Sequence, residues 1–66
     1  MKLTVNSNEF VAPDDYTVSQ LVGRLNIPSA GTAVAVNGKL VPQLMWPETK
    51  LRHGDDILII SAAYGG

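Results

Sequence analysis

Apolar and polar residues alternate from residue 2 to residue 6 of the chain. Leu3 and Val5 have polar neighbours on both sides, and a second segment, Glu-Phe-Val-Ala at residues 9–12, follows an Asn-Ser-Asn stretch at residues 6–8. Alternation with a period of two is typical of a β-strand, and asparagine and serine favour turns. The pattern therefore predicts an opening β-hairpin.

The next apolar positions have the spacing of a helix. They fall at i, i+3, i+4 and i+7, which forms one stripe of a short helix able to cover a sheet. Thr17 lies just before this stripe and Gln20 lies within it, and their spacing is that of a capping box. Asn26 and Pro28 favour the end of the helix. The stripe consists of Val18, Leu21, Val22 and Leu25.

A second hairpin and a last strand follow the helix. Residues 32–36 and 39–41 flank Asn37-Gly38, a dipeptide that favours a two-residue hairpin turn. Pro42 donates no ladder hydrogen bond, so the second strand of this hairpin ends there or lies at an edge. Residues 43–53 are irregular in pattern. Residues 57–61 follow a turn at 54–56. Their odd and even positions, which face opposite sides of a sheet, are both apolar, and this predicts a strand in the sheet centre.

The predicted element order is ββαβββ at most, which describes a small α+β domain with its helix packed on one sheet face. A single helix cannot cover both faces. The large aliphatic groups on the other face are either a docking surface or are covered by neighbouring loops, and the sequence does not choose between these alternatives.

Composition narrows the possible chemistry. Sixty-six residues form one small domain, and the formal net charge is −1 with five dispersed basic residues, so nucleic-acid binding is not predicted. Cysteine is absent, which excludes disulfides, thiolate metal sites and a thiol nucleophile from this chain. His53 is the one histidine, and we expect a solvated loop residue there and no metal site.

No phosphate-binding glycine motif is present, so we expect the chain to bind no nucleotide or other cofactor itself. The longest aliphatic run, residues 57–60, is far shorter than the roughly 20 residues of a membrane helix. The first residues lack the apolar stretch of a signal peptide. We therefore expect a cytoplasmic protein without membrane contact.

The sequence ends in Gly65-Gly66, shortly after the last predicted strand. Because glycine has no Cβ, such an end fits a narrow channel and presents an unhindered carboxylate to another protein. The alternative is a frayed terminus, although two final glycines arise by chance at only about half a percent. The segment from Ser61 extends roughly 20 Å, which is long enough to enter a partner's active site. Tyr64 either anchors this tail in a partner or rests on its own domain.

Several short motifs follow one another along the chain in a particular order. They are residues 1–5, Thr17-Val18 with Leu21, Val36-Asn37-Gly38, Val41-Pro42, Trp46, Leu51, Gly54-Asp55, the aliphatic last strand and Gly65-Gly66. In order and spacing they resemble the thiamine-biosynthesis sulfur carrier family, ThiS, over the whole chain. The resemblance implies the ubiquitin-like β-grasp fold, with a mixed sheet of four to five strands and one covering helix. It also implies a single sulfur-carrier domain over residues 1–66, with a flexible tail from about residue 62 to 66.

The resemblance further implies that this chain is a protein co-substrate and not an enzyme. The carboxylate of Gly66 would be adenylated by a separate ATP-dependent adenylyltransferase of the ThiF type, which is similar to ubiquitin-activating enzymes. A persulfide sulfur donor would then convert it to a thiocarboxylate, and a thiazole synthase of the ThiG type would receive the sulfur.

By the same resemblance, Ala63, Tyr64 and Gly65 contact these partners. It also places Ile57 and Ile59 toward the helix and Leu58 and Ile60 toward partners, a choice that alternation alone does not make. Two positions, Gln43 and Tyr64, depart from the family's usual residues. The alternatives are a carrier similar to the small subunit of molybdopterin synthase, a ubiquitin-like modifier attached to lysines, and an interaction domain whose terminal glycines are incidental.

Overall fold

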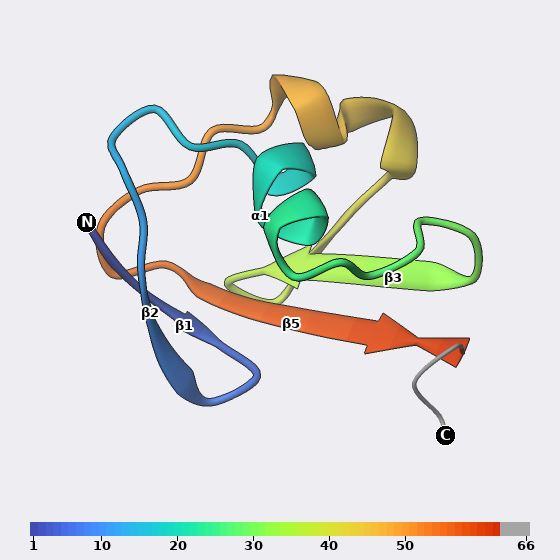
Figure 1. Ribbon diagram of the computed structural model, residues 1–66, viewed down its shortest axis with the longest axis horizontal. Helices are drawn as coiled ribbons and strands as arrows, with labels where there is room; N and C mark the ends of the chain where they lie inside the picture. Colours follow the sequence, from blue (N-terminus) through green and yellow to red (C-terminus); the bar gives the residue numbers. More distant parts are fainter. Residues whose placement is uncertain (63–66) are drawn as a thin grey trace.

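The computed structural model describes residues 1–62 and arranges them as one sheet with two helices on it (Figure 1). The ββαβββ order predicted from the sequence is confirmed, with a 3-10 helix added before the last strand. In chain order the elements are β1 (Lys2–Val5), β2 (Asn8–Val11), α1 (Val18–Arg24), β3 (Thr32–Val36), β4 (Lys39–Val41), η1 (Gln43–Glu48) and β5 (Asp56–Ser61).

The strands form a mixed sheet in the order β2-β1-β5-β3-β4. Strand β5 runs parallel to β1 and antiparallel to β3, and each outer pair is a hairpin. The last strand therefore lies in the centre, as its apolar character on both parities predicted, and β4 lies at an edge, as Pro42 predicted. This arrangement is the β-grasp fold.

Both hairpins turn through two residues in the left-handed region of φ. These residues are Asn6 (50°) and Ser7 (69°) in the first hairpin, and Asn37 (52°) and Gly38 (83°) in the second. Positive φ at both central positions defines the turn whose twist matches that of the flanking strands, and asparagine and glycine tolerate it best. The Asn-Gly prediction is confirmed, and the first hairpin uses the same geometry with an Asn-Ser pair.

Helix α1 begins as its capping box predicted. The Thr17 hydroxyl accepts a hydrogen bond from the Gln20 backbone N–H (3.1 Å), and the Gln20 side chain accepts one from the Thr17 N–H (2.8 Å). These bonds satisfy backbone donors that have no partner within the helix. The helix ends at Leu25, and Asn26 follows with φ of 57°.

We expect Thr17→Ala to lower the free energy of unfolding by about 1 kcal/mol, because the capping hydroxyl is lost. Chemical denaturation measures this change. Thr17→Ser keeps the hydroxyl and serves as the control, since it should retain most of the lost stability. Equal destabilisation by the two substitutions would contradict a capping role.

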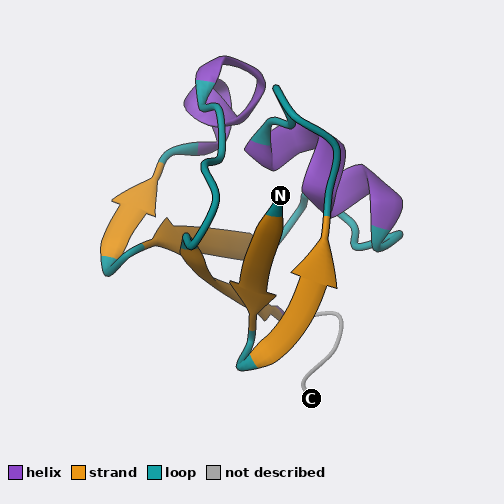
Figure 2. Ribbon diagram, turned by 90° about the vertical axis from the view of Figure 1, so that its left-hand side faces the viewer, coloured by secondary structure: helices purple, strands orange, loops and turns teal. Residues whose placement is uncertain are grey.

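The core lies between the sheet and the two helices, which occupy the same side of it (Figure 2). Alternate residues of the strands face this layer, and the predicted helical stripe meets them, with Leu25 at its partly buried margin. Burial of these apolar side chains is the main stabilising term in so small a domain. The most deeply buried side chains are Leu3, Val18, Leu21, Val34 and Ile57.

The segment that is irregular in sequence contains the 3-10 helix η1, which the pattern did not predict. Pro42 stands at its N-cap and Pro47 lies within it. Trp46 is buried against the core, and its indole Nε1–H donates to the Val41 carbonyl at 2.9 Å. The expectation that Trp46 packs beneath this loop is thus confirmed. Helix η1 covers part of the core beside α1.

Candidate functional site

The sheet face opposite the helices carries an apolar patch, which we name the open-face patch. Residues directly opposite in register share a face, and the register pairs Ala35 with both Leu58 and Leu40, and Ala33 with Ile60. Both alanines are short, so the larger side chains stand above the surface around them. The open-face patch consists of Ala33, Ala35, Leu40, Leu58 and Ile60.

The orientation of β5 agrees with the expectation from the family resemblance. Ile57 and Ile59 are buried at 0% and 6% exposure, whereas Leu58 and Ile60 are 50% and 61% exposed. The described loops therefore leave these two side chains largely uncovered. Leu40 is exposed beside them, a member of the patch that the sequence pattern did not single out. The role of Leu58 and Ile60 in binding partners stays a prediction.

The chain is held firmly where it leaves the sheet. Ser61 is buried, and its hydroxyl lies 2.9 Å from the Thr32 hydroxyl. The next residue, Ala62, donates its backbone N–H to the Gly31 carbonyl at 3.1 Å. We name Ser61 and Ala62 the tail root. The predicted partner contacts Ala63, Tyr64 and Gly65 and the predicted reactive residue Gly66 lie outside the described residues.

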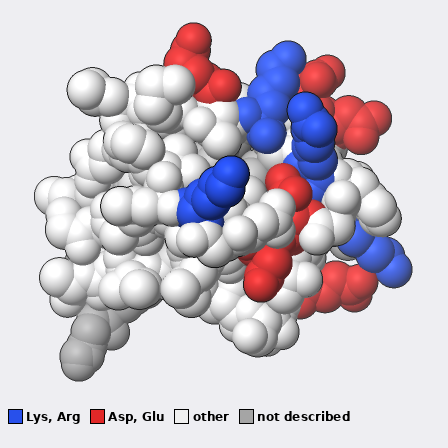
Figure 3. Space-filling view, turned by 180° about the vertical axis from the view of Figure 1, so that it is seen from behind, with Lys and Arg blue, Asp and Glu red and all other residues white. Residues whose placement is uncertain are grey.

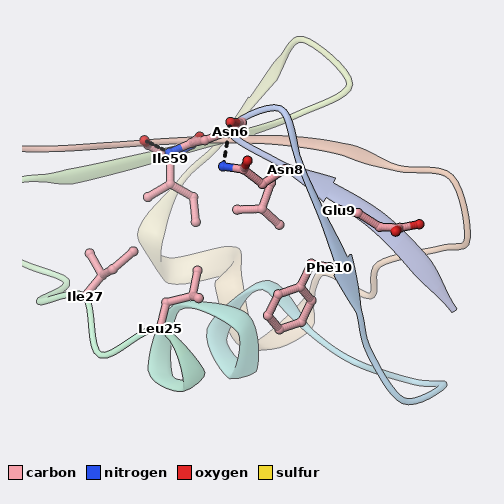
Figure 4. Close-up of a pocket in the computed structure, with 8 residues that line it drawn as sticks. Asn6, Asn8, Glu9, Phe10, Leu25, Ile27 and Ile59 are labelled. Carbon is pink, nitrogen blue, oxygen red and sulfur yellow. Dashed lines mark hydrogen bonds between the residues drawn. The ribbon is translucent and has the colours of Figure 1, made fainter.

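Asn6, which the sequence indicated only as a turn residue, contacts β5 at Ile59, two residues before the C-terminal end of the strand. Its side-chain Oδ1 accepts from the Ile59 N–H at 2.7 Å, and its Nδ2 donates to the Ile59 carbonyl at 3.1 Å. The two residues lie side by side in Figure 4. No local sequence signal identifies this contact, because its partners are 53 residues apart.

Charged side chains are concentrated away from the end of β5. Every lysine, arginine, aspartate and glutamate lies before residue 57. From behind, most of the coloured charged groups lie toward the right of the view, and the left-hand edge shows none (Figure 3). Beyond Asp56, the exposed side chains of β5 are thus apolar and lie next to the tail root, which fits a protein partner better than a polyanion.

The polar residues considered from the sequence have structural contacts. The Asp55 carboxylate accepts hydrogen bonds from the Asn37 side chain (2.9 Å) and the Arg52 backbone N–H (2.8 Å). His53 is exposed and accepts a hydrogen bond from the Lys2 backbone N–H at Nδ1. Over residues 1–62, no three histidine, aspartate or glutamate side chains cluster as metal ligands. In the same range, no helix is long and apolar enough to cross a membrane.

Gln43, one of the two departures from the family pattern, has a contact within the domain. Its side-chain Nε2 donates to the Ser29 carbonyl and, at 3.4 Å, to the Thr32 carbonyl. These bonds connect the start of η1 to the loop before β3, and this loop includes Gly31, to which the tail root is bonded. Gln43 therefore adds hydrogen bonds within the domain, next to the loop residue that bonds the tail root.

Comparison with known proteins agrees with this geometry. The model of the ThiS family matches residues 1–66. The sulfur carrier protein ThiS of Escherichia coli K12 is 30% identical over the full length of both chains. A thiazole synthase of Paramagnetospirillum magneticum is 32% identical over the whole of this chain, which spans 20% of that protein.

Among solved structures, the thiamine biosynthesis protein ThiS of Geobacter metallireducens superposes with a TM-score of 0.84 over the full length of both chains, at 23% identity. This likeness independently supports the β-grasp fold. The family model and the full-length relative assign the function, which is to carry sulfur and not to catalyse a reaction. The chain therefore belongs to the ThiS family of sulfur carrier proteins.

Proposed function

We propose that the sulfur is carried on the C-terminal carboxylate of Gly66 and is used to make the thiazole ring of thiamine. A separate adenylyltransferase of the ThiF type activates this carboxylate with ATP, a persulfide supplies the sulfur, and a thiazole synthase of the ThiG type receives it. The chain binds no cofactor of its own, and the cycle takes place in the cytoplasm.

The chemistry accounts for the residues at the end of the chain. A carboxylate is a poor electrophile. When its oxygen attacks the α-phosphorus of ATP, pyrophosphate leaves and an acyl-adenylate forms. A persulfide sulfur then attacks the carbonyl carbon and expels AMP, and a thiol that cleaves the resulting S–S bond releases the thiocarboxylate. Because the backbone terminus holds the sulfur, the chain requires no cysteine, and it contains none.

The position of β5 is the observation that carries this proposal. The strand lies at the sheet centre, presents Leu58 and Ile60 to solvent, and leads through the tail root toward Gly65 and Gly66. A partner docked on the open-face patch would lie next to the point where the tail begins. Docking there and insertion of the tail into an active site are therefore compatible with one orientation of the domain.

Thiazole synthase is favoured as the sulfur acceptor by the relative from Paramagnetospirillum magneticum. In that protein a segment similar to this whole chain forms part of the same polypeptide. Joining two partners covalently raises their effective concentration, which is useful when they act together. We infer that the chain described here meets a protein of the same kind.

Intact-mass spectrometry tests the proposal directly. The purified chain, incubated with its adenylyltransferase, ATP and a persulfide donor, should gain the mass that corresponds to one oxygen replaced by sulfur. Without the donor, the acyl-adenylate should accumulate, and alkylation should label only the sulfur-bearing product. The absence of this mass change with a cognate adenylyltransferase would contradict the carrier chemistry. Isopeptide conjugates to lysine instead would indicate the modifier alternative.

A further inference from the structure

Strand β5 is supported unequally on its two sides. Strand β3 pairs with it from Ile57 to Ser61, whereas β1 pairs with it only through Thr4 and Val5, opposite Asp56 and Ile57. Among residues 1–62, the part of β5 beyond Ile57 therefore has a strand along one side only. Backbone groups at such a margin are left to water unless a side chain replaces the missing strand.

Asn6 takes the place of the missing strand beside Ile59 of β5. Its backbone N–H continues the ladder to the Ile57 carbonyl at 2.9 Å. Its side-chain amide then accepts from the Ile59 N–H and donates to the Ile59 carbonyl, so it satisfies both backbone groups that Ile59 turns toward the missing strand. The left-handed backbone at Asn6, with φ of 50°, turns the chain into β2 at the same residue.

A cavity of about 250 Å³ adjoins this contact, between the first hairpin and the end of α1 (Figure 4). Asn6 and Ile59 line it together with apolar side chains such as Phe10 and Leu25. Without the Asn6 amide, water in this space would reach the Ile59 backbone and compete for its hydrogen bonds. The end of β5 would then be held mainly from the β3 side.

We propose that Asn6 is a positioning residue for the sulfur-carrying tail. Its amide keeps the end of β5 ordered, so that the tail root leaves the sheet at a fixed point relative to the open-face patch. This inference rests on the proposed function of Gly66. The ordering of the strand end precedes the chemistry and is equally present in the ground and transition states, so its loss raises KM and leaves kcat nearly unchanged.

The chain itself offers a matched control. Asn37 has the same backbone geometry, with φ of 52°, and occupies the same place in the second hairpin turn. Its Oδ1 accepts from the Asp56 N–H at 2.9 Å, so it also bonds to the β5 backbone. That contact lies at the start of β5, remote from the tail root. Glycine substitution at either site removes the amide and still permits the left-handed backbone.

The experiment compares Asn6→Gly and Asn37→Gly in adenylation by the cognate adenylyltransferase and in amide hydrogen exchange. We expect Asn6→Gly to raise KM for the carrier about tenfold, the equivalent of one or two hydrogen bonds, with kcat within twofold. Exchange of the Ile59 amide, whose N–H bonds to the Asn6 side chain, should accelerate. Asn37→Gly should accelerate exchange at Asp56 and leave KM within twofold.

Two outcomes would overturn the inference. One is an equal rise in KM in both variants, because that would reflect general loss of stability. The other is an unchanged KM in Asn6→Gly, even if exchange of the Ile59 amide accelerates. If Asn6→Gly does not fold, Asn6→Asp replaces it, since a carboxylate accepts from the Ile59 N–H and cannot donate to the carbonyl. An effect on KM in Asn6→Asp is expected, and none would reject the role. Thiocarboxylate formation by the unaltered chain tests the proposed function separately.

Discussion

Deletion of Gly65 and Gly66 should abolish thiocarboxylate formation and leave the fold unchanged. The shortened chain still ends in a carboxylate, but that group lies about 7 Å short of its original reach and directly beside the Tyr64 side chain. A misplacement of only about 1 Å at a reacting centre costs on the order of 10²-fold in rate, so we expect a loss of at least that size. Intact-mass spectrometry measures the product, and denaturation measures the stability.

A chain made by semisynthesis with a C-terminal carboxamide provides the control for this deletion. It keeps both glycines and their reach and removes only the charged oxygen that we propose attacks ATP. It should bind the adenylyltransferase with an affinity close to that of the unaltered chain and form no adenylate. If the shortened chain gains sulfur at the unaltered rate, the reactive group is not at the terminus.

Substitution of the exposed β5 side chains should weaken partner binding strongly. We expect Leu58→Thr and Ile60→Thr each to cost about 2 kcal/mol in binding to the adenylyltransferase, or roughly thirtyfold in Kd, as for central apolar contacts of an interface. Threonine keeps the strand preference of the backbone, and both positions are at least half exposed, so stability should change by only about 0.5 kcal/mol. Isothermal titration calorimetry measures the affinity.

Leu44→Thr is the matched control for these substitutions. Leu44 is a more exposed leucine, at 91%, but it lies in η1 on the helix-covered side of the sheet. Removing it should leave Kd unchanged. If Leu44→Thr weakens binding as much as Leu58→Thr does, the partner does not dock on the open-face patch, even if the terminal chemistry is correct.

The elements of this fold were predictable wherever the signal was local. Thr17 and Gln20 are three residues apart, and Asn37-Gly38 is a contiguous pair, so each determines its turn or cap without help from the rest of the chain. Helix η1 was not predictable, because Pro42 and Pro47 interrupt every regular pattern there and a six-residue 3-10 helix has no strong periodicity.

The candidate site was predictable in part. The apolar run of β5 indicated a central strand, but alternation leaves the two faces equivalent, and only the family resemblance placed Leu58 and Ile60 outward. The pairing of Asn6 with Ile59 had no signal at all in the sequence. It depends on β1 and β5 lying side by side, a long-range arrangement that the packing of the whole sheet determines.

The central place of β5 also has a consequence for synthesis of the protein. Strands β1 and β3 are translated before β5. Neither can pair with β5, its neighbour at the sheet centre, until residues 56–61 have been translated. A nascent or prematurely terminated chain therefore lacks the middle of its sheet and cannot assemble this domain. Completion of the fold is thus coupled to translation of the last strand, so an activating enzyme that recognises the folded sheet would not engage unfinished carriers.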